Sequence, residues 1–374
     1  MSDRSSGDSL GVAISSSTEL GTVQRQAREQ LARGVALHQQ RELDAAVLAF
    51  RTAAELYERL GDRVRLDRAL SGLVLCCYEL GNYTAVLERA QDWLQLAREL
   101  KNHESEEQAL GHLGNACRHL GDFERAISYQ TQSLTIAEAI GDRQSQVAIL
   151  NNLALAYKSV GNHAQAIEYL NQALLVLSSD RDERAEVQVL KNLANTYYSQ
   201  GDHGQAMLRY ERLLSLALER DDYQSAGQVL RSLANAARNL GDFDRAIAYC
   251  KQRLSVMRIL KDLRGEAQTL GTLGVAYDSQ GDYSKAIEYY QQRLAVVRQL
   301  QEVTLEAEVL GQLQVAYYAL GDRVKSNQFM RQRDALLGSP EEEPSAEQDH
   351  HAETTVSVPP DDDSNNTAVR DVRI

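Results

Sequence analysis

Amide and cationic side chains predominate at three positions that repeat at forty-residue intervals along the chain, and their chemistry suits peptide recognition. An asparagine amide offers two donors and an acceptor, which match the hydrogen-bonding groups of a peptide backbone. Arginine binds a carboxylate through two parallel hydrogen bonds, and lysine presents a compact positive charge. The residues of this set are Asn115, Arg118, Asn151, Lys158, Lys191, Asn195, Tyr198, Arg231, Asn235 and Arg238.

This set falls on one face of a series of predicted helices. At about 100° per residue, its positions point away from the apolar stripe of the same helix, which Leu150, Leu153 and Ala154 mark in one repeat. Across the four middle repeats this face carries five cations and no acid, although the chain has a net charge of −13. We therefore expect the set to line an inner groove. A merely solvated polar face is the alternative interpretation.

Regular turn signals predict the helices that carry this set. Glycine followed by aspartate or asparagine recurs every forty residues from Gly81 to Gly321, and further turn signals such as Gly61-Asp62 and Lys101-Asn102 fall midway. Glycine accepts the left-handed conformation that ends a helix, and aspartate or asparagine caps the next helix. The spacing predicts eight units of two helices with about four turns each.

Small residues inside each unit predict how the helices pack. Gly114 in a first helix matches Ala126 in the second, and the same pairing recurs in later units, so the helices can approach closely. One hairpin cannot bury both of its apolar faces, and stacking of the units buries them. The predicted fold is all-α, an α-solenoid. The expected units are residues 21–60, 61–100, 101–140, 141–180, 181–220, 221–260, 261–300 and 301–338 of an array spanning 21–338.

The repeated motif, seen in LGHLGNACRHLGDF and LKNLANTYYSQGD, resembles the tetratricopeptide repeat (TPR). The forty-residue period is similar to that of kinesin light chain repeats and of Leu-Gly-Asn-repeat adaptors. The resemblance implies a right-handed TPR superhelix whose inner face binds peptides. Trp93 and Val86 depart from the small residues of the motif, and Gln314, Arg323 and Ser326 depart from it in the last unit, which favours terminal capping.

Few features of the sequence favour catalysis or a cofactor. Nucleotide-binding, zinc-protease, serine-hydrolase and Cys-x-x-Cys motifs are absent from the sequence, so we expect no enzyme, no cofactor and no metal. His112 and His119 lie seven residues apart without a third ligand and are interpreted as surface or groove residues. The cysteines lack a disulfide or metal spacing and are predicted to be buried thiols. They are Cys76, Cys77, Cys117 and Cys250.

Both ends of the chain differ from the repeats. Residues 1–20 are rich in serine and are expected to be disordered. Residues 339–374 contain all four prolines and carry −8 of the net charge, so we expect an acidic disordered tail that acts as a solubilising segment or contacts the basic groove of the same molecule. The net acidity argues against nucleic acid as a partner. No membrane span or signal segment is evident, and a cytoplasmic location is expected.

These observations favour a non-catalytic adaptor or scaffold that binds acidic or extended peptide segments of partner proteins. The alternative is a regulatory TPR protein of a signalling or assembly pathway, whose target binding is switched by a ligand or by its own acidic tail. The sequence leaves the oligomeric state open. It also leaves open whether the peptide binds as a strand or as a helix.

Overall fold

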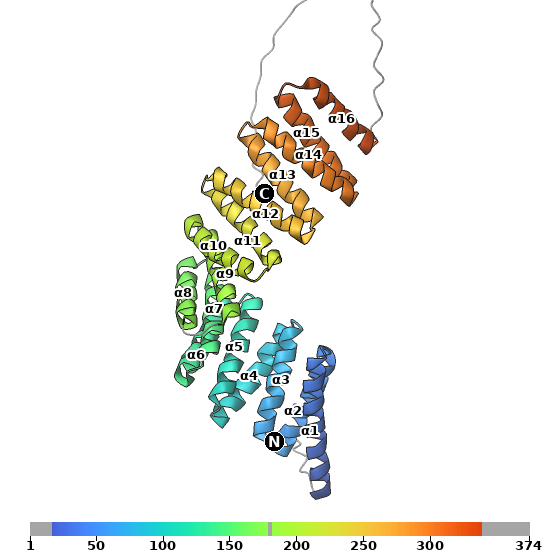
Figure 1. Cartoon of the computed structure of the whole chain (residues 1–374). Helices are drawn as coiled ribbons and strands as arrows, with labels where there is room; N and C mark the ends of the chain where they lie inside the picture. Colours follow the sequence, from blue (N-terminus) through green and yellow to red (C-terminus); the bar gives the residue numbers. More distant parts are fainter. Residues whose placement is uncertain (1–16, 179–181, 339–374) are drawn as a thin grey trace, which may run out of the picture.

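The computed structural model describes residues 17–178 and 182–338, and its regular structure is a succession of sixteen helices with no strand. Figure 1 shows the helices stacked in order from the N-terminal to the C-terminal end. The helices are α1 (Ser17–Gln39), α2 (Leu43–Leu60), α3 (Arg63–Glu79), α4 (Tyr83–Leu100), α5 (His103–His119), α6 (Phe123–Ile140), α7 (Arg143–Ser159), α8 (His163–Leu177), α9 (Glu183–Gln200), α10 (His203–Glu219), α11 (Tyr223–Asn239), α12 (Phe243–Leu260), α13 (Leu263–Ser279), α14 (Tyr283–Leu300), α15 (Val303–Ala319) and α16 (Arg323–Leu337).

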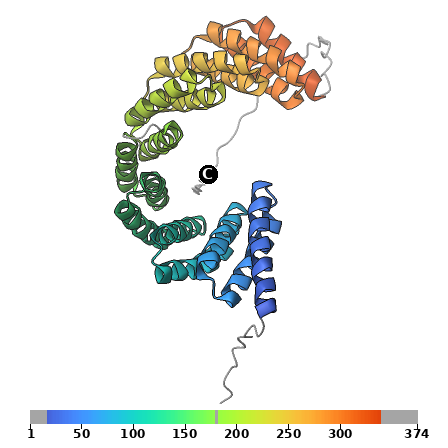
Figure 2. The same ribbon diagram turned by 60° about the horizontal axis from the view of Figure 1, so that its bottom comes forward.

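The helices form eight antiparallel pairs, and the pairs stack into an arc (Figure 2). Each helix packs mainly against its neighbours in the chain. Consecutive odd-numbered helices also touch one another from α1 to α9, whereas no two even-numbered helices in the described part pack to the same extent. Because the inner side of a curved stack is the crowded side, the odd-numbered helices line the inside of the arc. The predicted α-solenoid is confirmed.

The turns lie where the glycine spacing predicts them. Glycine has a positive φ at Gly81, Gly121 and the later positions of that series, and the aspartate or asparagine that follows caps the next helix. The side chain of Asn82, for example, accepts a hydrogen bond of 3.2 Å from the backbone N–H of Ala85. Five turns hold a side-chain-bearing residue in the same left-handed region, where a Cβ atom is strained. These residues are Arg41, Lys101, Asp221, Lys261 and Gln301.

Replacement of Lys261 by glycine is expected to raise the free energy of unfolding by up to about 1 kcal/mol, because it relieves a left-handed conformation at φ 56°. Urea unfolding followed by circular dichroism measures the change. Lys261→Ala is the matched control, since alanine keeps the Cβ atom. An equal gain from Lys261→Ala would show that the lysine side chain, and not the backbone conformation, had been destabilising.

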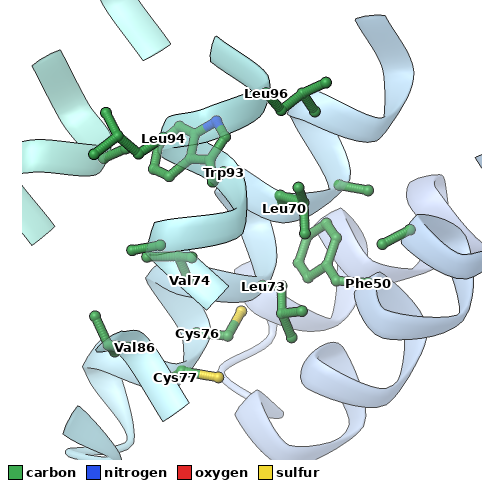
Figure 3. Close-up of a cluster of buried hydrophobic side chains, with 14 of the residues drawn as sticks. Phe50, Leu70, Leu73, Val74, Cys76, Cys77, Val86, Trp93, Leu94 and Leu96 are labelled. Atoms are coloured by element: carbon green, nitrogen blue, oxygen red, sulfur yellow. The ribbon is translucent and has the colours of Figure 1, made fainter. Parts of the chain in front are cut away.

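Glycines inside the helices make room for large core residues. A Cβ atom on Gly34 or Gly72 would lie 2.8 Å or 2.5 Å from the ring of Phe50, so both positions need glycine for close packing. Figure 3 shows Phe50 of α2 beside Leu70 and Leu73 of α3 in the core of the N-terminal units. The core therefore continues from one unit into the next, as stacking requires.

The predicted disordered segments largely lie outside the described residues, as does all of the tail 339–374. Helix α1 begins at Ser17, which is four residues before the predicted start of the array. Glu19 in its first turn favours this earlier start, because an acidic side chain stabilises a helix N-terminus. None of the helices in the described part of the chain is long and apolar enough to cross a membrane.

Candidate functional site

Three neighbouring cavities lie along the odd-numbered helices in the middle and C-terminal parts of the arc. The first has a volume of about 480 Å³ and lies between α7 and α9, where Asn151 lines it. The second, about 320 Å³, lies between α9 and α11. The third, about 520 Å³, is formed by α11 to α15 and is lined by Asn235 and Arg238. The structure therefore places several residues of the predicted groove in consecutive cavities.

The second cavity brings together three residues of the predicted groove. Lys191, Asn195 and Arg231 all line it, and they come from two different units. Lys191 and Arg231 are exposed, and neither forms an ion pair with another residue of the described chain. The pKa of Arg253 is lowered, first by burial and then by the positive charge of Arg231. The lining of this cavity carries three cations, Lys191, Arg220 and Arg231, and one acid, Asp222, so its net charge is positive.

The side-chain oxygens of the asparagines at one repeated position accept hydrogen bonds from residues of their own unit. Tyr210 donates a hydrogen bond of 2.6 Å to Oδ1 of Asn195, and Gln130 Nε2 donates one of 3.1 Å to Oδ1 of Asn115. Oδ1 of Asn235 accepts from Arg238 at 3.5 Å. Each amide therefore has its oxygen fixed by the protein, and its Nδ2 group is left to donate to a ligand.

Three other residues of the predicted groove tie odd-numbered helices to one another. Asn192 on α9 donates a hydrogen bond of 2.6 Å to Asn151 on α7, and Lys158 Nζ donates one of 3.4 Å to the backbone carbonyl of Asn195. Burial lowers the pKa of Lys158. Asn239 donates to the hydroxyl of Tyr198 at 2.9 Å, which links α11 to α9. These side chains have a structural role on the inner face that the sequence interpretation did not include.

Arg118 lies in an aromatic corner between α3 and α5, away from these cavities. It is half-buried, and its Nη2 atom lies 3.0 Å from Nε2 of His119. The ring of His119 stacks on Tyr83 with a centroid distance of 4.2 Å. His112 is half-buried with its Nδ1 atom enclosed, and burial lowers its pKa to about 4. Within the described residues no cluster of histidine, cysteine and acidic side chains could hold a metal ion.

Sequence reasoning missed the cations that reach the inner side from the second helices. Arg253, Arg293 and Arg333 occupy equivalent positions on α12, α14 and α16, forty residues apart. Each side chain reaches toward the odd-numbered helices; a Cβ atom on Gly271, for example, would lie 2.9 Å from Nε of Arg293. The signal that could have found them is the forty-residue recurrence of this arginine, which in the last two units is paired with Gly271 or Gly311 in the first helix.

The predicted buried thiols are confirmed. All four cysteines are free and less than a tenth exposed, and burial raises the pKa of each. A thiol is reactive mainly as the thiolate, so these residues are protected from ordinary oxidation at neutral pH. Cys250 is distinguished by lining the third cavity.

Comparison with known families shows which kind of repeat forms this architecture. A family model described as tetratricopeptide repeat matches residues 68–139, 105–177, 145–219 and 225–299, and a second model with the same description matches 191–255. The chain belongs to the tetratricopeptide repeat family. The resemblance seen in the sequence is thereby confirmed. No curated protein matches this TPR chain.

Solved structures show the same fold at low sequence identity. The apo form of RapI is 15% identical with a TM-score of 0.53, and the match covers 74% of this TPR chain and 98% of RapI. A signal transduction ATPase with a tetratricopeptide repeat sensor from Pyrococcus horikoshii is 15% identical with a TM-score of 0.52, covering 83% of this chain and 52% of the ATPase. The C-terminal part of a TPR protein from Cytophaga hutchinsonii is 14% identical, with a TM-score of 0.52 over 72% of this chain and 95% of that one.

Proposed function

We propose that this TPR protein is a non-catalytic adaptor that binds peptide segments of partner proteins along the inside of the arc and prefers acidic segments. The observation that carries the proposal is the second cavity, in which Lys191, Arg231 and the amide of Asn195 converge. Stacked repeats use such concave surfaces for extended ligands. Peptide carboxylates would pair with the two cations, and the free Nδ2 group would donate to a peptide carbonyl.

The third cavity extends the proposed path toward the C-terminal end. Arg238 and Asn235 lie one turn apart on α11 and line it, while Arg231 on the same helix lines the second cavity. A peptide running along α11 would therefore meet a cation in each cavity. Exposed ion pairs contribute only modestly, on the order of 1 kcal/mol each, so we expect moderate affinity that salt weakens.

The test is the double reversal Arg231→Glu with Arg238→Glu. A fluorescent twelve-residue peptide alternating glutamate with glycine serves as the probe, and its glutamine counterpart serves as the neutral comparison. Fluorescence anisotropy should show at least about a tenfold loss of affinity for the acidic peptide in the double variant, because two attractive contacts become repulsive. The affinity for the acidic peptide should also fall as salt is raised.

Arg59→Glu with Arg331→Glu is the matched control, because it changes the net charge equally on exposed positions of the even-numbered helices α2 and α16. This control should bind the acidic peptide like the unmodified chain. Equal losses of affinity in the two double variants would show that the effect comes from the net charge of the chain and not from the groove. Unchanged affinity in the groove variant would refute the assignment.

The acidic segment 339–374 is the counterpart of this groove within the same chain. Its charge of −8 complements the cations of the second and third cavities. We propose that it competes with partner peptides for the inner face, which would make the adaptor self-regulating.

A further inference from the structure

The third cavity contains a buried guanidinium whose hydrogen-bonding capacity the protein does not use fully. Arg293 is 7% exposed and lines this cavity. Its Nη1 atom donates to Glu308 at 3.0 Å and to Gln312 at 2.7 Å. Its Nε atom is buried and has no hydrogen-bond partner among the described residues. A buried donor without a partner is costly, so this one requires an explanation.

The equivalent arginines of the neighbouring units show how the same side chain is satisfied elsewhere. Arg253 donates through Nε to the carbonyl of Gly227, through Nη1 to Thr269 and through Nη2 to Gln268. Arg333 uses Nε and Nη2 for one carboxylate oxygen of Asp334. Among these three equivalent residues, Arg293 keeps the edge formed by Nε and Nη2 for another partner. That edge is the one that grips a carboxylate through two hydrogen bonds.

The walls of the cavity define what kind of molecule could bring that carboxylate. Phe243, Ile247 and Val275 give it an apolar side, and Phe243 and Val275 are about half exposed although they are large and apolar. The charged residues that face it are Arg238, Arg293 and Glu308, which leave a net positive charge. Glu308 lies at the rim with its side chain 55% exposed. The volume of about 520 Å³ is in the range of small-molecule sites.

Gly271 lets the guanidinium of Arg293 pack closely against α13. It lines the same cavity, and a Cβ atom there would lie 2.9 Å from Nε and 3.0 Å from the central carbon of the guanidinium. A side chain at this position would therefore clash with the guanidinium and displace it. The equivalent residue on α11 is Arg231, which projects into the neighbouring cavity instead.

We propose that the third cavity is a binding site for a small organic carboxylate with an apolar body, whose carboxylate pairs with Nε and Nη2 of Arg293. The apolar body packs against Phe243, Ile247 and Val275. Because Asn235 and Arg238 line the same cavity, an occupant of this site lies beside the proposed peptide path. The site itself does not depend on peptide binding, since Arg293 is outside the predicted groove set.

Equilibrium dialysis of the full chain with octanoate and with phenylacetate tests this site, and the corresponding amides serve as uncharged comparisons. We expect one acid molecule bound per chain, and about tenfold weaker binding of each amide, because the amide lacks the charge that pairs with the guanidinium. Bound acid should also slow the alkylation of Cys250, and not of Cys117, by N-ethylmaleimide. This protection would locate the acid in the third cavity.

Two variants separate the site from general stability. Arg293→Gln and Gly271→Ala should both lose acid binding, the first by removing the charge and the second by displacing the guanidinium. Arg253→Gln, at the equivalent and fully bonded position, should retain it. The proposal is overturned if neither acid binds to the unmodified chain. It is also overturned if Arg293→Gln binds the acids as tightly as the unmodified chain does. Loss of acidic-peptide binding in Arg293→Gln without any binding of free acids would assign the arginine to a peptide side chain, and would likewise overturn it.

Discussion

Replacement of Trp93 by alanine is expected to lower the free energy of unfolding by about 3–5 kcal/mol, the range for removing a large aromatic side chain from a core. Trp93 is 1% exposed, and its indole Nε1 donates a buried hydrogen bond of 2.8 Å to Asp67. The substitution would leave both a cavity and a buried carboxylate with one donor fewer. Urea unfolding followed by circular dichroism measures the loss.

Asp67 joins α3 to the next unit as well, since Ser105 donates a hydrogen bond of 2.8 Å to it. Trp93→Phe separates the two contributions, because phenylalanine keeps much of the ring packing and lacks the N–H donor. We expect Trp93→Phe to be less destabilising than Trp93→Ala. A loss below about 1 kcal/mol for Trp93→Ala would mean that the units repack around the missing ring, as in the unit that carries Ala173 at the equivalent position.

The second large effect concerns the pH dependence of stability at His112. Its ring lies 5.6 Å from that of Tyr78 and 6.2 Å from that of Trp93, and burial lowers its pKa from 6.5 to about 4. Between these two pH values the unfolded chain binds a proton that the folded chain does not. Stability from this residue is therefore complete above pH 6.5 and is lost as pH falls toward 4, by up to about 3 kcal/mol.

His112→Asn is the variant that checks this effect, because Asn152 and Asn192 occupy the equivalent position in the next two units. Urea midpoints measured between pH 7.5 and pH 4 should fall more steeply for the unmodified chain than for His112→Asn. The carboxylates titrate in both proteins, so the difference between the two curves isolates the histidine. Parallel curves would show that the pKa of His112 is the same in the folded and the unfolded chain.

The fold was largely predictable because the ends of its helices are determined by local sequence. A glycine at Gly121 and an aspartate at Asp122 determine a helix end and a cap through their own backbone preferences, and neither depends on distant residues. The turn at Lys101 has no glycine, and it was predicted from the regular spacing of the other turns. The aromatic surroundings of His112 were not foreseen, because they include Trp93, which departs from the small residues of the repeat and belongs to another unit.

The candidate site was predictable as a face but not as a set of contacts. Helical spacing places Lys191 and Arg231 on the same side of consecutive first helices, and the structure brings them into one cavity. The same spacing says nothing about which side chains bond to a neighbouring unit, so the bonds made by Lys158 and Tyr198 were not foreseen. Arg293 was not predicted because it belongs to a second helix, and its side chain reaches the inner side by packing against Gly271 of the first helix.

The contacts between odd-numbered helices should also affect how easily the arc is extended by a pulling force. From α1 to α9 these helices touch directly, and the bond between Asn151 and Asn192 adds a cross-link, whereas α11, α13 and α15 do not pack to the same extent within the described residues. We expect the part from α1 to α9 to resist extension more than the part from α11 to α15. A tethered partner that pulls on both ends would then extend the array mainly between α11 and α15, where the largest of the three cavities lies.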